Sequence, residues 1–125
     1  MSISWALDEG GRLIRTLGIG DVTAGEVASH LEELDGRLDP GVRFDVLLDL
    51  GGCTSLPTSE QLREIAAQLG RLGGRHRFGR CAIVAQRDAL FGMTRMFEVF
   101  AQDQFAETRA FRAADEAERW LRAAD

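Results

Sequence analysis

The most informative stretch of this 125-residue chain is residues 44–60, which read FDVLLDLGGCTSLPTSE. The run from Phe44 to Leu50 is short, apolar and followed by glycines, which is typical of a strand buried in a sheet. Thr58 and Gln61 have the spacing of a capping box, in which a hydroxyl and a longer polar side chain bind the first free amides of a helix. The stretch therefore predicts a buried strand, a loop and a helix in succession.

Strands and helices alternate on both sides of this stretch. Residues 3–8 and 12–17 are separated by a short gap that contains glycine, which predicts a β-hairpin at the start of the chain. A second capping box at Thr23 predicts a helix that stops before Pro40. Beyond the central stretch we expect a helix that ends at residues 73–74, a strand over 81–85, a helix capped by Asp88 that runs to about Gln102, a strand over 107–112 and a closing helix.

The resulting order, β-β-α-β-α-β-α-β-α, is that of an α/β fold. Strands joined through helices form right-handed crossovers and a mainly parallel sheet flanked by helices, and the opening hairpin adds an antiparallel edge strand. The chain has the length of one domain, residues 1–125. The apolar positions expected to form the core recur at helical spacing, namely Val27, Leu31, Leu34 and Leu38; Leu62, Ile65, Ala66, Leu69 and Leu72; and Ala117, Trp120, Leu121 and Ala124.

The composition removes several kinds of chemistry from consideration. All 15 basic residues are arginines, and the chain contains no lysine, no tyrosine and no asparagine. Without lysine there is no Schiff-base or phosphate-loop lysine. His30 and His76 belong to no zinc-binding motif, and His30 is expected on the solvated side of its helix. We therefore expect no metal, no cofactor and no catalytic residue in this chain.

An enzyme would need unusual help from Cys53 or from an acid such as Asp49. Cys53 precedes the predicted helix, whose N-terminus could lower the pKa of the thiol. A thiol phosphatase loop also needs an arginine six positions further on, and that position is Ser59. We expect Cys53 to be a buried structural residue, and Asp49 to bind amides of the loop.

The loop after the central strand resembles the signature of the STAS domain, the sulfate-transporter and anti-sigma-factor-antagonist family, in its divergent SpoIIAA-like branch. The positions that match in register are Asp49, Leu50, Gly52, Thr54 and Leu56. The resemblance implies a SpoIIAA-like fold, and it places the phosphorylatable serine of the family at Thr58 and the neighbouring hydroxyl residue at Ser59. Pro57 stands where the family has an aspartate, and Glu60 stands where it has a glycine.

This resemblance implies a non-enzymatic regulatory module that binds a partner protein through the loop and helix start at residues 52–62. The candidate contacts or phosphate acceptors are Leu56, Pro57, Thr58, Ser59 and Glu60. A phosphoryl group on Thr58 would add about −1.5 to −2 charges beside the free amides of a helix N-terminus. The alternative is that Thr58 serves only as the N-cap of its helix.

The third predicted helix supports a hypothesis of a different class. Apolar side chains on its otherwise polar face indicate a homodimer surface or the wall of an apolar pocket. Phe91, Arg95 and Val99 are therefore candidates for self-association, or for a carrier or sensor of a small apolar or lipid-like ligand. The core stripe of the same helix is expected to be Leu90, Met93, Met96, Phe97 and Phe100.

Charge and hydropathy limit the kinds of partner that the chain can bind and the cellular compartment in which we expect it. The net charge is −5, and a local basic cluster is typical of cations near the end of a helix, so we expect no nucleic-acid partner. No apolar run is long enough to span a bilayer, and the first residues lack a signal-peptide pattern, so we expect no membrane insertion. Two cysteines in a chain without a secretory signal indicate reduced thiols, and we therefore expect a soluble, cytoplasmic protein. The basic cluster consists of Arg71, Arg75, His76, Arg77 and Arg80.

Overall fold

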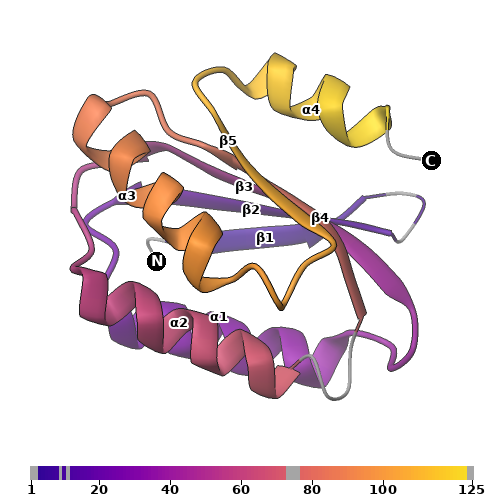
Figure 1. Ribbon diagram of the computed structural model, residues 1–125. Coiled ribbons are helices and arrows are strands. Elements are labelled where there is room, and N and C mark those ends of the chain that lie inside the picture. The colour runs from indigo at the N-terminus through magenta and orange to yellow at the C-terminus, as the bar shows by residue number, and fades with distance from the viewer. Residues whose placement is uncertain (1–2, 9, 11, 73–76, 124–125) are drawn as a thin grey trace.

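The computed structural model describes the whole chain except residues 1–2, 9, 11, 73–76 and 124–125 (Figure 1). Its elements follow the predicted order, and the fold class is confirmed. Part of the hairpin turn, the predicted end of the second helix, two members of the basic cluster and Ala124 lie outside the described residues. The elements are β1 (Ile3–Leu7), β2 (Leu13–Gly20), α1 (Ala24–Arg37), β3 (Arg43–Cys53), α2 (Ser59–Leu72), β4 (Arg77–Val84), α3 (Asp88–Phe100), β5 (Glu107–Phe111) and α4 (Ala114–Arg122).

The five strands form one sheet in the order β1-β2-β3-β4-β5. β1 runs antiparallel to β2, and β2 to β5 run parallel to one another, so the antiparallel edge strand is confirmed. Because each right-handed crossover moves one strand further in the same direction, α1, α2 and α3 all lie on one face of the sheet. α4 follows the last strand and packs on the opposite face, as Figure 1 shows.

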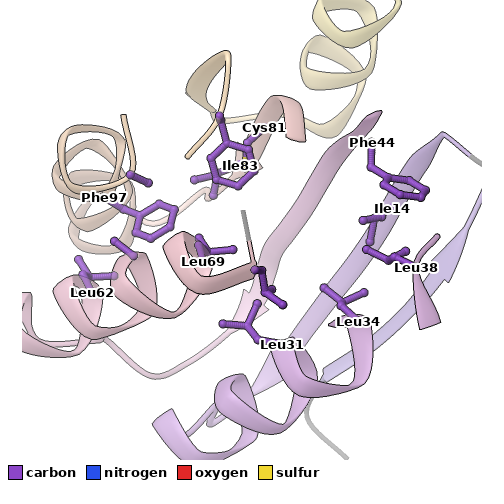
Figure 2. Close-up of a cluster of buried hydrophobic side chains, with 14 residues drawn as sticks. Ile14, Leu31, Leu34, Leu38, Phe44, Leu62, Leu69, Cys81, Ile83 and Phe97 are labelled. Atoms are coloured by element: carbon purple, nitrogen blue, oxygen red, sulfur yellow. The ribbon is translucent and has the colours of Figure 1, made fainter. Parts of the chain in front are cut away.

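The main core lies between the sheet and the three crossover helices (Figure 2). Alternate residues of each strand point to this face, so Ile14 of β2, Phe44 of β3 and Ile83 of β4 meet the leucines of α1 and α2 and Phe97 of α3. Val27 and Ile65 are partly buried against this cluster. The other core positions predicted in the first two helices are all buried, namely Leu31, Leu34, Leu38, Leu62, Ala66, Leu69 and Leu72.

A second, smaller core lies beneath α4. The side chains of α4 that reach the sheet are Ala117 and Leu121, as predicted, and Trp120 is partly buried beside them. Arg80 of β4 links this helix to the sheet, because its guanidinium donates a hydrogen bond to the carbonyl oxygen of Trp120 at 2.9 Å. The strand residues of this core are Leu47, Ala82 and Val84.

β3 is longer than predicted, because it continues past Leu50 to Cys53. Gly52 and Cys53 pair with the end of β2, and this pairing outweighs the low strand propensity of glycine. Gly18 of β2 permits the approach, since a Cβ atom at that position would lie only 2.9 Å from the sulfur of Cys53. The loop that joins β3 to α2 is therefore residues 54–58, shorter than the sequence indicated.

The start of α3 differs from the prediction. Asp88 is the first residue of the helix and not its cap, and the N-cap residue, Arg87, makes no side-chain capping hydrogen bond. The carboxylate of Asp88 forms an ion pair with Arg112 instead, at 2.5 Å. As the first helical residue, Asp88 lies one position too late to serve as the N-cap, which is why the local capping pattern was misleading.

The faces of α3 also differ from the prediction. Met96, expected in the core, is 38% exposed, whereas Thr94 is buried. Thr94 tolerates burial because its hydroxyl donates to the carbonyl oxygen of Phe91 at 2.7 Å. Although α3 is rich in apolar residues, none of the helices within the described residues is long and apolar enough to cross a membrane.

Candidate functional site

A cavity of about 190 Å³ lies inside the main core, between the sheet and the three crossover helices. Val46, Leu48 and Leu50 of β3 form the centre of its floor, because alternate residues of that strand point toward the helices. Leu31, Leu62 and Phe97 contribute to the opposite wall from α1, α2 and α3 (Figure 2). No aspartate, glutamate or arginine is among the described residues that line the cavity.

The rim of the cavity lies where α1 and α2 begin, at the carboxyl ends of β2 and β3. Thr23 and Ala24 both line the cavity and are exposed to solvent, and Ser55 lines it from the loop after β3. The Oγ of Ser55 accepts a hydrogen bond from the backbone amide of Val22 at 3.0 Å, which ties the loop to the start of α1. Ligand sites of open α/β sheets lie at this edge, so the cavity is placed where the fold favours binding.

The loop of residues 54–58 forms a wall between the cavity and solvent. Ser55 and Pro57 line the cavity, whereas Leu56 and Thr58 are exposed, with 47% of Leu56 accessible. The predicted contact residues are therefore divided, because Pro57 faces inward and Leu56 and Thr58 face outward. Glu60, in the first turn of α2, is exposed, and Ser59 is half-buried.

Thr58 caps α2 as predicted. Its Oγ1 accepts a hydrogen bond from the amide of Gln61 at 3.1 Å, and the side chain of Gln61 accepts one from the amide of Thr58 at 2.9 Å. A phosphoryl group on Thr58 would stand at the end of the helix dipole, at an exposed position.

The candidate residues of α3 lie on its outer side. Val99 is 61% exposed, and Arg95 pairs with Glu98 on the same helix at 3.4 Å. Phe91 is half-buried beneath the guanidinium of Arg112, which lies 4.3 Å from the centre of the ring. The side of α3 that lines the cavity is a different one, formed by Leu90, Met93, Thr94 and Phe97.

Both cysteines are free, buried and part of the cavity wall. Burial raises the pKa of the Cys53 thiol, the carboxylate of Asp49 raises it further, and Arg87 opposes the shift. Burial raises the pKa of the Cys81 thiol to about 12. Both thiols are thereby held in the protonated form, which is a poor nucleophile. The predicted burial of Cys53 is confirmed.

The two acids of β3 bind backbone amides. Asp49 accepts a hydrogen bond from the amide of Gly51 at 2.9 Å, as predicted for the loop. Asp45 accepts one from the amide of Arg80 at 2.8 Å and so links β3 to β4. Each carboxylate therefore has a structural role that accounts for its presence in an apolar strand.

One polar pair interrupts the apolar wall and was not predicted from the sequence. Thr16 of β2 is buried, its Oγ1 lies 3.3 Å from Nε2 of His30 on α1, and both side chains line the cavity. The prediction of a solvated His30 is wrong. A usable signal was present, because His30 lies three residues after Val27 and four before Leu34, which places it beside the buried stripe of α1.

His30 is electrostatically unusual as well as partly buried. Burial lowers the pKa of its imidazole below the ordinary value of 6.5, while the negative charge of Glu33 acts in the opposite direction. Its Nδ1 atom is buried and has no hydrogen-bond partner among the described residues. A buried polar atom without a partner is uncommon in a folded protein.

The comparisons with known proteins concern the fold. The family model described as SpoIIAA-like matches residues 13–122. Among solved structures, an uncharacterized protein from the DUF3478 family with a SpoIIAA-like fold, from Shewanella loihica PV-4, aligns with a TM-score of 0.63 and 20% sequence identity. The alignment covers 96% of this chain and 94% of that chain, and at this identity the likeness shows the fold alone. No curated protein matches the sequence.

Proposed function

Because this chain belongs to the SpoIIAA-like family, we propose that it is a non-enzymatic regulatory module that senses a small apolar ligand. The ligand would bind in the cavity between the sheet and the helices α1, α2 and α3. The observation that carries this proposal is the cavity of about 190 Å³, whose described walls are apolar apart from a few neutral polar groups. The proposed site therefore lies on the inner side of α3 and not on its outer side.

Because the cavity is large, the stability of the folded protein depends on what occupies it. A dry apolar cavity of roughly 150 Å³ in a protein core is able to bind benzene. At about 24 cal/mol per Å³, a cavity of about 190 Å³ would cost at most roughly 4–5 kcal/mol if neither ligand nor solvent entered it. That cost is a large share of the ~5–15 kcal/mol by which a domain is stable. An apolar molecule of about ten non-hydrogen atoms would therefore stabilise the fold.

The loop of residues 54–58 connects the cavity with the surface. Pro57 lines the cavity, and its two neighbours, Leu56 and Thr58, are exposed. The ring of Pro57 restricts the backbone, so a ligand that moves Pro57 would also move the residues on either side. Binding in the core would thereby alter the surface that a partner protein meets.

Native mass spectrometry of the protein purified from its own source is the direct test. We expect an apolar adduct that is lost when the chain is denatured. The same protein should bind ethylbenzene in a calorimetric titration. A bare chain from the source together with no binding of ethylbenzene would overturn the proposal.

Two matched substitutions locate the ligand. Val46→Phe places a larger side chain in the floor of the cavity, and Val99→Phe makes the same change at an exposed position on α3. We expect Val46→Phe to abolish binding of ethylbenzene while circular dichroism shows a folded protein, and Val99→Phe to leave binding unchanged. Loss of binding with Val99→Phe alone would place the ligand on the outer side of α3, near Phe91 and Arg95.

A second candidate function, partner binding through the exposed loop, is favoured by Leu56. This large apolar side chain is 47% exposed beside Thr58 and Glu60, which are also exposed. The partner would be another protein or a second copy of this chain. Analytical ultracentrifugation should then show an association that Leu56→Asp abolishes and Thr58→Glu alters. A phosphoryl increment on Thr58 or Ser59 in the native mass would support regulation by phosphorylation, and a monomer unaffected by either substitution would contradict self-association.

A further inference from the structure

We propose that the ligand of the cavity is an uncharged molecule with one hydrogen-bond-accepting oxygen, and that Thr16 and His30 bind this oxygen. The inference rests on the proposed function, because it assigns a chemical class to the ligand of the same cavity. It makes Thr16 and His30 specificity-determining residues, whereas the apolar wall determines affinity for the body of the ligand.

The other polar side chains of the cavity wall are already engaged. At the rim, Thr23 caps α1 and Gln61 completes the capping box of α2. Ser55 binds the backbone of Val22, and Thr94 donates its hydroxyl proton to the carbonyl oxygen of Phe91. Among the described groups that line the cavity away from the rim, Thr16 and His30 form the pair that has a buried polar atom without a partner.

Thr16 and His30 together have one more hydrogen-bond donor than their mutual contact uses. A neutral imidazole has one donor and one acceptor, and a hydroxyl has one donor and two acceptor positions. The contact of 3.3 Å between Thr16 Oγ1 and His30 Nε2 uses one donor. If Thr16 donates to Nε2, then the N–H at Nδ1 of His30 has no partner. If His30 donates from Nε2, then the hydroxyl proton of Thr16 is free. In either tautomer one donor remains, which an acceptor oxygen of the ligand would bind; in the second tautomer the unpartnered Nδ1 would also accept a hydrogen bond from a ligand hydroxyl.

The surroundings of the pair favour a ligand without charge. The described residues that line the cavity include no arginine and no carboxylate, so an ionised ligand would lose its hydration without gaining an ion pair. Burial keeps the pKa of His30 below its ordinary value, and His30 is therefore mainly neutral at neutral pH. Glu33, the nearby acid of α1, accepts a hydrogen bond from the indole nitrogen of Trp5. A ketone, ether or hydroxyl oxygen fits these conditions.

Acetophenone and ethylbenzene are suitable probes, because they have nearly the same shape and differ by one carbonyl oxygen. Their dissociation constants should be measured by titration calorimetry on the full chain and on Thr16→Val, which keeps the shape of the side chain and removes the hydroxyl. We expect Thr16→Val to weaken binding of acetophenone about five- to tenfold relative to ethylbenzene. Thr108→Val, which removes a buried hydroxyl of β5 that is not among the described residues lining the cavity, should leave the ratio of the two constants unchanged.

A measurement on the unmodified protein keeps the inference falsifiable if a variant fails to fold. The imidazole ¹⁵N resonances of His30 should shift much more on addition of acetophenone than on addition of ethylbenzene, because a hydrogen bond to the imidazole changes these resonances more than a neighbouring aromatic ring does. Binding of both probes with the same ratio of constants in all three proteins, or with no selective shift of His30, would overturn this inference and leave the proposed function standing. Binding of neither probe would overturn the proposed function itself.

Discussion

Gly79 of β4 has no room for a methyl group. A Cβ atom there would lie 2.6 Å from Nε of Arg43 and still closer to a carboxylate oxygen of Asp45. That oxygen accepts the hydrogen bond from the amide of Arg80 at 2.8 Å, so it cannot move without leaving a partly buried amide unpaired. We expect Gly79→Ala to lower the free energy of unfolding by about 1–3 kcal/mol in urea denaturation.

Gly36 of α1 is the matched control for this substitution. An added Cβ atom would meet nothing within 4 Å, and the residue is exposed in a helix. Gly36→Ala should therefore raise the free energy of unfolding by about 0.5–1 kcal/mol, the helix propensity difference between the two residues. Equal destabilisation by both substitutions would contradict the argument from close contact.

The imidazole of His30 makes stability depend on pH. Burial lowers its pKa in the folded protein below 6.5, so the unfolded chain binds the proton more readily than the folded protein does. The contribution of His30 to stability is therefore complete above the unfolded pKa and is lost as the pH falls from there to the lowered folded pKa. Urea denaturation at about pH 7.5 and pH 5.5 should show this loss.

The variant His30→Phe is the control for the pH experiment. It removes the titrating group, so its free energy of unfolding should change less between the two pH values than that of the unmodified protein. An identical change in the two proteins would assign the pH dependence to other groups.

Among the secondary-structure elements, the helices differ in whether nearby residues determine where they begin. α1 and α2 begin with complete capping boxes, at Thr23 and at Thr58, whereas α3 has no side-chain cap. The starts of the first two helices therefore depend on residues within one turn. α3 begins after β4 without such a local cap, and Asp88 in its first turn pairs with Arg112, which follows β5.

This difference predicts unequal effects of two alanine substitutions. Thr58→Ala removes a capping hydroxyl and should lower the free energy of unfolding by about 1 kcal/mol. Asp88→Ala should cost less, because it removes an ion pair whose carboxylate is 92% exposed. Chemical denaturation followed by circular dichroism measures both, and a larger loss for Asp88→Ala would show that Asp88 caps α3 after all.

The whole molecule is asymmetric about its sheet. On one face α4 packs close to the strands over small side chains such as Ala82 and Ala117. On the other face three helices surround a cavity of about 190 Å³. The asymmetry follows from the strand order, because three consecutive right-handed crossovers place three helices on the same side.

The rate at which the Cys81 thiol is modified depends on how often the main core opens. Cys81 of β4 is buried in the main core, and its pKa is raised to about 12. We expect iodoacetamide at about pH 8 to modify Cys81 at least about a hundredfold more slowly in the folded protein than in urea, because the thiolate forms only after the core opens. Rapid modification under native conditions would show that the core opens readily. Ethylbenzene should slow the reaction further if it binds in the cavity.

The sequence alone determined the order of the elements, the capping boxes at Thr23 and Thr58 and the leucines of the core, because each of these depends on residues within a few positions of one another. It also drew attention to residues 52–62, and the structure shows that the loop within them, residues 54–58, borders the cavity. The extension of β3 to Cys53, the exposure of Met96 and the contact between Thr16 and His30 depend on which elements become neighbours in space. The tertiary structure decided these features and the cavity itself, because a cavity is formed by side chains from several elements and no local pattern records the distance between those elements.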